Sequence, residues 1–178
     1  MLEEPGLLRI AGPNGSGKST LLELVSGFLA PHTGVVRVCG ARASDPAARR
    51  VRSVCRTAPA LYPSMTARDH LVFAARCRRA ELPLVLERAA RYGLSPWLER
   101  QAAALSTGNQ RKLWLLACTL LPTPVIVLDE PFNGMDDDGV ETLVGELTEW
   151  SASRLVLLIA HAMPKGLTAD RTMKLGPS

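Results

Sequence analysis

The sequence predicts an α/β domain with a mainly parallel sheet and an inserted all-helical subdomain. Short apolar runs bounded by turn residues alternate with longer segments of helical periodicity, a pattern typical of parallel sheets. The pattern is wholly helical from about 66 to 105, and strand-like runs resume at 125. Because 178 residues with 47% hydrophobic side chains suffice for one core, we expect a single domain over residues 1–178, with the helical subdomain at roughly 66–104.

The first half of the chain is expected to begin with a strand and a helix. Residues 7–11 form an apolar run that predicts a strand, and residues 18–29 have helical spacing. A second, short strand is predicted for the β-branched run at 35–39. The stretch at 41–63 is rich in Arg, Ala and Pro, and we expect a helical turn and a loop there.

Capping residues mark the helices of the next region. Thr66 with Asp69 approximates a capping box at the start of a first helix, and Ser106 is expected to cap a third helix that ends near 121. The remaining expected elements are a second helix at 84–92, a buried strand at 125–128, a helix at 137–150 and a buried strand at 155–160.

Charge is distributed unevenly along the chain, although the formal net charge is only +4. Residues 37–79 contain ten Arg and two Asp, whereas residues 125–150 contain eight acidic residues and no Lys or Arg. The basic segment keeps nucleic acid open as a partner. For its four arginines at 68, 76, 78 and 79, a solvated helix face is the simpler alternative.

Neither a membrane span nor an export signal is expected from the residue pattern. The longest apolar run, near 113–121, is well short of the roughly 20 residues that a membrane helix needs. The first residues carry neither a basic start nor an apolar stretch. We therefore expect a chain that does not cross the bilayer and is not exported.

The cysteines favour a reducing compartment. Cys39, Cys55, Cys77 and Cys118 form no C-x-x-C pair, so their spacing fits neither a zinc site nor a dense disulfide framework. We expect reduced, mostly buried thiols in the cytosol.

A glycine-rich loop between the first strand and the first helix predicts phosphate binding. It fits the pattern G-x-x-x-x-G-K-[ST], in which glycines let backbone N–H groups surround phosphate oxygens at a helix N-terminus. Lys18 is expected to reach the β- and γ-phosphates, and the Ser19 hydroxyl to ligate Mg²⁺. The candidate nucleotide-binding residues are Gly12, Pro13, Asn14, Gly15, Ser16, Gly17, Lys18, Ser19 and Thr20.

Acidic residues follow the buried strand at 125–128, where open α/β sheets bind ligands. Asp129 is a candidate Mg²⁺ partner through water, and Glu130 is a candidate catalytic carboxylate that polarises the attacking water. His161 ends the next strand and is a candidate catalytic residue if the two strands are neighbours. Taken alone, these residues could be a solvated strand end and a turn histidine; the phosphate loop favours the catalytic interpretation.

From Gly6 to about Leu175 the chain resembles the ATP-binding cassette (ABC) ATPases, which are P-loop NTPases. The run Leu105-Ser106-Thr107-Gly108-Asn109 is similar to the LSGGQ signature of that family, and the acidic strand follows it at a short separation. The resemblance implies that Ser106, Gly108 and Asn109 face the γ-phosphate held by a second subunit. A capped helix N-terminus suits this role because its N–H groups bind anions, whereas the alternative is an ordinary N-capped helix.

Two further segments match that family. The run Asn133-Gly134-Met135-Asp136 resembles its D-loop, which implies that Asp136 lies at the interface of a cassette dimer. His161 matches the switch histidine that senses the γ-phosphate. The resemblance thus implies that two cassettes sandwich two ATP molecules head to tail.

The chain also departs from the family pattern. Thr57 stands where a glutamine is expected, and Thr107 and Asn109 replace Gly and Gln in the signature. Only five residues precede Gly6, so the family's N-terminal antiparallel strands and the aromatic that stacks on adenine are apparently missing. A fragment, a misassigned start or a different base contact would each explain this.

The resemblance implies an ATP-binding and ATP-hydrolysing subunit of a bacterial ABC transporter, closer to exporters than to importers. Its cofactors would be ATP and Mg²⁺, and its partners a transmembrane permease subunit and a second ABC ATPase subunit, at the cytoplasmic face of the membrane. The helical block would dock the permease, with Arg68, Arg76, Arg78 and Arg79 facing acidic loops or lipid headgroups.

Two alternatives stay open at this point. Thr57 and the missing strands suggest a truncated or weakly hydrolysing nucleotide-binding regulator. A soluble ABC protein that acts on nucleic acid is less favoured, because 87 positions separate Lys18 from Leu105 and no heptad run fills them.

Overall fold

The computed structural model describes residues 4–176, and the chain folds as two compact units. We call them the sheet unit and the helical unit. The sheet unit comprises Met1–Val54, Thr123–Glu130 and Glu146–Ser178, and the helical unit comprises Cys55–Pro122 and Pro131–Gly145. The expected single domain, with its helical part at 66–104, stays a prediction.

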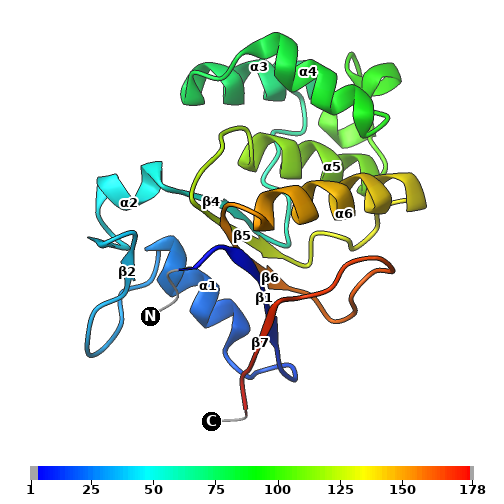
Figure 1. Cartoon of the computed structure of the whole chain (residues 1–178). Helices are drawn as coiled ribbons and strands as arrows, with labels where there is room; N and C mark the ends of the chain where they lie inside the picture. Colours follow the sequence, from blue (N-terminus) through cyan, green and yellow to red (C-terminus); the bar gives the residue numbers. More distant parts are fainter. Residues whose placement is uncertain (1–3, 177–178) are drawn as a thin grey trace. The chain divides into compact units, whose positions relative to one another are not determined.

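A five-stranded sheet forms the centre of the sheet unit, in the order β4-β5-β6-β1-β7 (Figure 1). Its β1 pairs in parallel with both β6 and β7, and β5 pairs in parallel with β6. The strands are β1 (Gly6–Ala11), β4 (Arg52–Cys55), β5 (Val125–Asp129), β6 (Leu155–Ile159) and β7 (Arg171–Lys174). The expected strands at 7–11, 125–128 and 155–160 are therefore confirmed.

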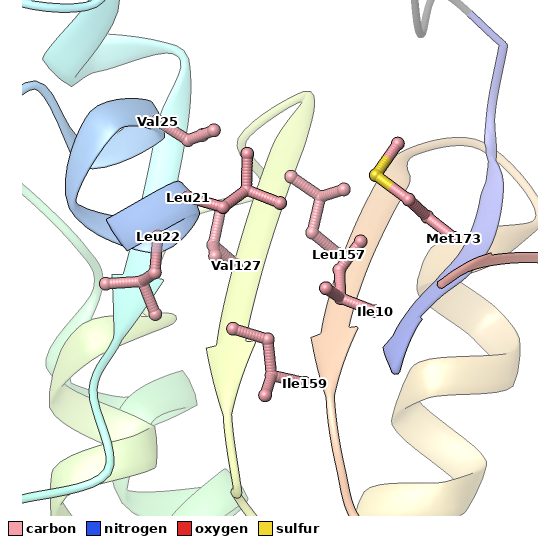
Figure 2. A pocket seen from close by; sticks show the side chains of 8 residues that line it. All are labelled: Ile10, Leu21, Leu22, Val25, Val127, Leu157, Ile159 and Met173. Carbon is pink, nitrogen blue, oxygen red and sulfur yellow. The ribbon is translucent and has the colours of Figure 1, made fainter. Parts of the chain in front are cut away.

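One face of this sheet packs against α1 (Lys18–Ser26). Leu22 of α1 is buried among alternate residues of the strands, and Figure 2 shows Leu21 and Val25 beside it, facing the same sheet side chains. The helix ends three residues before the predicted position 29. The physical reason is Gly27, whose φ of 69° is left-handed and whose N–H bonds the carbonyls of the last turn.

The region at 35–63 differs most from the sequence prediction. The strand expected at 35–39 is reduced to β2 (Arg37–Val38), which pairs antiparallel with β3 (Ala41–Arg42). The expected helical turn is α2 (Pro46–Arg50), but the stretch predicted as loop also contains β4. The loop prediction was wrong at β4, because the residues of this strand, Arg-Ser-Val-Cys, form no apolar run. Its first residue, Arg52, is nevertheless buried, and its guanidinium donates to the Ser26 carbonyl.

The helical unit consists mainly of α3 (Ala67–Arg78), α4 (Leu82–Arg91) and α5 (Thr107–Cys118), with α3 packed on both of the others (Figure 1). The capping box is confirmed: the Thr66 side chain accepts from the Asp69 N–H, and the Asp69 carboxylate accepts from the Thr66 N–H. Short 3-10 turns at Ser95–Trp97 and Ala102–Ala104 join α4 to α5.

The last long helix, α6 (Asp137–Ser151), has its first part in the helical unit and its last turns in the sheet unit. Among residues 4–176, no helix combines the length and the apolar character that crossing a membrane requires.

All four cysteines are free thiols, as expected, but they are not mostly buried. Cys55 is buried and Cys118 half-buried, whereas Cys39 and Cys77 are exposed. Cys39 lies in a turn with a left-handed φ of 47° and Cys77 lies on an outer face of α3. A hydrogen bond with the Cys55 thiol, together with burial, raises the pKa of Cys118 well above its usual range.

Candidate nucleotide site

The phosphate loop joins β1 directly to α1, as the sequence predicts. Gly15 and Gly17 adopt φ angles of 82° and 90°, which side chains with a Cβ rarely tolerate. A Cβ built on either glycine would meet no atom within 4 Å. These glycines are therefore needed for the shape of the loop, and the space in front of it stays open.

The polar groups of the loop point to an anion site. Lys18 Nζ donates to the carbonyls of Gly12, at 2.8 Å, and Pro13, at 2.9 Å, so the ammonium lies folded over the loop. The Ser16 hydroxyl is buried, with no hydrogen-bond partner among the described residues. Because Gly17 is the N-cap of α1 and supplies no side-chain cap, the first N–H groups of the helix suit an anion.

The strand register brings the acidic residues to the phosphate loop. Ile159, the last residue of β6, pairs with Ile10 of β1 on one side and with Asp129 of β5 on the other. The chain segments that leave these strands are the phosphate loop, Glu130 and His161. All of them therefore lie at one edge of the sheet, where the sequence analysis placed them.

Glu130 is held in an unusual backbone conformation at this edge. Its φ of 48° is left-handed, and its N–H donates to the Ile159 carbonyl at 2.8 Å. Its side chain is only 13% exposed, and Oε1 lies 3.6 Å from His161 Nε2. That distance is too long for a hydrogen bond, so Oε1 has no hydrogen-bond partner within residues 4–176. A buried carboxylate oxygen with a free acceptor position can orient a water molecule, and such backbone strain is common at functional sites.

The donor set at this edge fits Mg²⁺. Asp129 ends β5 with a carboxylate, and Ser19 carries an exposed hydroxyl in the first turn of α1. In the described part of the chain, no group of three or more His, Cys, Asp or Glu side chains is arranged so that it could hold a metal ion. Mg²⁺ is commonly held by one or two such protein oxygens together with phosphate and water, rather than by an all-protein cage.

In the helical unit, the signature-like residues form the N-terminus of α5. Ser106 is the N-cap, and its Oγ accepts from the Asn109 N–H at 3.2 Å. Gln110 Nε2 donates to the carbonyls of Ala102 and Leu105, at 2.9 and 3.2 Å. These bonds fix the start of the helix, whose N–H groups can face an anion.

The D-loop-like segment is tied to the same helix. Lys112 Nζ lies 2.7 Å from Asp136 Oδ1, and the Gly139 N–H donates to the same carboxylate at 2.9 Å. The hydrogen bond with Lys112 lowers the pKa of Asp136 below its ordinary value. A Cβ on Gly108 would meet the Gly134 carbonyl at 2.5 Å, so the two segments are closely packed.

The segment at Thr57 is also held by α5. The Arg111 guanidinium donates to the Thr57 carbonyl, and Trp114 Nε1 donates to the Arg56 carbonyl at 3.1 Å. No role for Arg111, Lys112 or Trp114 was predicted from the sequence. The signal that could have found them is their place in α5, a helix whose other buried side chains are apolar, so that polar groups there need bonding partners.

Comparison with known proteins identifies the family. Residues 2–133 match the profile of the family described as ABC transporter. The chain belongs to the ABC transporter family. The cassette is 32% identical to the bicarbonate transport ATP-binding protein CmpD of Synechococcus elongatus, over 99% of this chain and 67% of that protein. It is 31% identical to the cytochrome c biogenesis ATP-binding export protein CcmA of Rhodopseudomonas palustris, over 95% of this chain and 84% of that protein. It is 29% identical to the thiamine import ATP-binding protein ThiQ of Vibrio vulnificus, over 90% of this chain and 72% of that protein.

Solved structures agree with this membership. An ATP-binding subunit of an ABC transporter superposes with a TM-score of 0.84 at 25% identity, covering 96% of this chain and 74% of that chain. A dimeric bacterial ABC transporter cassette has a TM-score of 0.82 at 20% identity, covering 99% and 84%, and so shares the fold.

These relationships confirm the predicted P-loop fold and the predicted function. The cassette is an ATP-binding ATPase subunit of an ABC transporter. Its relatives include both import and export proteins, so the preference for an exporter stays a prediction. The roles of individual site residues stay predictions as well.

Proposed function

We propose that this cassette binds Mg-ATP at the carboxyl edge of its sheet and hydrolyses it when a second cassette closes over the γ-phosphate. The observation that carries the proposal is the register in which Ile159 pairs with both Ile10 and Asp129. It brings a phosphate-binding loop, an acidic strand end and a histidine to one edge of a single sheet.

The phosphate loop would hold the triphosphate by positioning and charge. Its candidate contacts are Gly12 to Thr20, with the backbone N–H groups around the phosphate oxygens and the α1 dipole behind them. Lys18 would exchange its two carbonyl acceptors for phosphate oxygens, which are stronger acceptors for an ammonium group. ATP binding should therefore draw this side chain away from Gly12 and Pro13.

Mg²⁺ would be held by the Ser19 hydroxyl and, through water, by Asp129. Bound there, the ion would neutralise charge on the β- and γ-phosphates. Glu130 supplies the catalytic acceptor: its unpartnered Oε1 would orient the attacking water. His161, whose Nε2 lies 3.6 Å from that oxygen, would contact the γ-phosphate on the other side.

The second cassette would contribute the N-terminus of its α5. Ser106, Gly108 and Asn109 would face the γ-phosphate held by the first chain, using helix N–H groups and the exposed serine. Asp136 would act at the same interface through its bonds to Lys112 and the Gly139 N–H, which link the D-loop-like segment to α5.

A transmembrane permease would be the partner that uses these motions, with the cassette at the cytoplasmic face of the membrane. Relatives carry the names of transport proteins for bicarbonate and thiamine, which supports a transporter but names no cargo for this chain. In the helical unit, Arg76, Arg78 and Arg79 are exposed at the end of α3, whereas Arg68 is paired with Glu99 at 2.5 Å. These three arginines have no ion-pair partner among residues 4–176 and are thus the better candidates for an acidic permease loop.

Size-exclusion chromatography with and without Mg-ATP tests the proposal. Glu130→Gln removes the negative charge and one of the two acceptor oxygens with almost no change in size, so the variant should accumulate as an ATP-bound dimer. Lys18→Ala should stay monomeric and bind ATP at least about tenfold more weakly, because charge-assisted bonds are lost. Glu141→Gln, the same change on an exposed position of α6, should behave like the wild type.

A Glu130→Gln variant that elutes only as monomer in Mg-ATP would contradict the dimer proposal. Turnover distinguishes the regulator alternative. If wild type and Glu130→Gln release phosphate at the same rate, the chain is a nucleotide-binding regulator that does not hydrolyse through Glu130.

A further inference from the structure

Arg9 is the one charged residue of β1, in the strand sequence Gly-Leu-Leu-Arg-Ile-Ala. Its neighbours Leu8 and Ile10 are buried in the core that packs against α1. Since successive side chains of a strand point to opposite faces, Arg9 lies on the other face of the sheet. A half-buried guanidinium in an otherwise apolar strand is expensive unless its N–H groups are bonded.

The Arg9 side chain is bonded to the chain segment that carries His161. Nη2 donates to the His161 carbonyl at 2.7 Å and to the Ala160 carbonyl at 3.3 Å, and Nε donates to the Ala160 carbonyl at 3.4 Å. Arg9 pairs with Leu158 in the sheet register, so its side chain reaches two to three residues further along the chain, past the end of β6 at Ile159. At about 3.3 Å per residue this is close to the full length of an arginine side chain.

These bonds act where the sheet no longer holds the chain. The registers of β6 with β1 and β5 both end at Ile159, one residue before Ala160 and two before His161. The guanidinium therefore fixes the backbone of Ala160 and His161 beyond the last strand pair. A planar fork of charged donors restricts both position and orientation better than one neutral bond does.

We propose that Arg9 is a positioning residue for the ATPase site. By holding the His161 backbone it keeps the imidazole at the Glu130 carboxylate, 3.6 Å from Oε1, where it would contact the γ-phosphate. This inference rests on the proposed role of His161. Arg9 lies on the strand that runs into the phosphate loop, so one strand carries both the start of that loop and the anchor of the histidine.

Imidazole resonances provide a test that does not depend on turnover. The chain contains three histidines, His32, His70 and His161, whose ring ¹H–¹⁵N signals can be assigned with His161→Ala. Arg9→Met should shift and broaden the His161 signals and leave those of His70 in place, because the His70 ring is bonded to Tyr62 and Thr66. Arg9→Lys, which keeps the charge but not the fork, should give an intermediate change.

Arg37→Met is the matched control. Arg37 is an exposed arginine of β2 that also donates to a carbonyl, that of Gly40, at 2.8 Å. Arg37→Met removes the same charge and the same kind of hydrogen bond as Arg9→Met does, and the His161 signals should not move. Unchanged His161 signals in Arg9→Met, or equal shifts in both variants, would overturn the inference.

Kinetics of the purified chain separate positioning from general destabilisation. Arg9→Met should lower kcat about tenfold and leave the KM for ATP within about twofold, since the phosphate loop, which would make most of the triphosphate contacts, is not changed. Combined with His161→Ala, it should cause little further loss, because both changes remove the same interaction. Full additivity of the two losses would overturn the inference while leaving the proposed function intact. If His161→Ala alone leaves kcat unchanged, the proposed role of His161 fails, and the inference fails with it.

Discussion

Replacing Gly108 by Ala should destabilise the helical unit, although the same substitution usually stabilises a helix. The Cβ would lie 2.5 Å from the Gly134 carbonyl oxygen, closer than such atoms approach in proteins. The obstacle is a backbone atom, which cannot rotate away as a flexible side chain could. The start of α5 and the loop at Gly134 must therefore separate.

The expected magnitude follows from two opposing effects. Overpacking of this kind costs about 1–3 kcal/mol. Ala gains about 0.5–1 kcal/mol over Gly in a helix by restricting the unfolded chain. The net expectation for Gly108→Ala is a loss of about 1–2 kcal/mol, or a fall of about 0.5–1 M in the urea midpoint at ordinary m-values.

Gly145→Ala is the matched control for this experiment. Gly145 is an exposed glycine inside α6, and a Cβ there would meet no atom within 4 Å. It should therefore raise stability by about 0.4–1 kcal/mol. Urea unfolding of both variants, followed by far-UV circular dichroism, measures the difference. If Gly108→Ala is as stable as the wild type or more stable, the close packing of Gly108 on Gly134 is refuted.

Two further predictions follow from the Asp136 ion pair and from a cavity under α1. The pKa of Asp136 is lower in the folded chain than in the unfolded chain. Its bond with Lys112 should therefore stabilise the fold fully at pH values above the carboxyl pKa of the unfolded chain, and this stabilisation should be lost as the pH falls through the pKa of the folded chain. Asp136→Asn should thus be less stable than wild type at pH 7 and equal to it in strong acid; a difference that is constant with pH would contradict this. Val127→Ile should fill part of the apolar cavity of about 60 Å³ (Figure 2) and raise stability by about 0.5–1 kcal/mol in thermal unfolding; a lower melting temperature would show that the cavity cannot accept a methylene.

Features that depend on residue type at a fixed spacing were predictable from the sequence. The phosphate loop requires glycines where φ is positive, and Gly15 and Gly17 have that conformation. The strand at 125–128 was predictable because a fully buried parallel strand is uniformly apolar, and β5 extends it by one residue. The capping box at Thr66 is likewise a local pattern.

Elements that depend on partners far along the chain were not predictable. No strand was predicted at β4 or β7, because their sequences contain charged and polar residues and no apolar run. These two are the outermost strands of the sheet, so each forms backbone hydrogen bonds with only one neighbouring strand. Helix ends were also misplaced: α5 ends at Cys118 and not near 121.

The order of residues specifies which chemical groups are present and where they lie along the chain: a phosphate loop, a signature-like helix start, an acidic strand end and a histidine. Which of these groups meet depends on the fold. Glu130 and His161 are neighbours because β5 and β6 are paired in parallel, and Arg9 reaches His161 because β1 lies on the other side of β6. Local periodicity records how one segment packs, whereas strand order and register arise from the packing of the whole sheet, so these meetings cannot be read from any single segment.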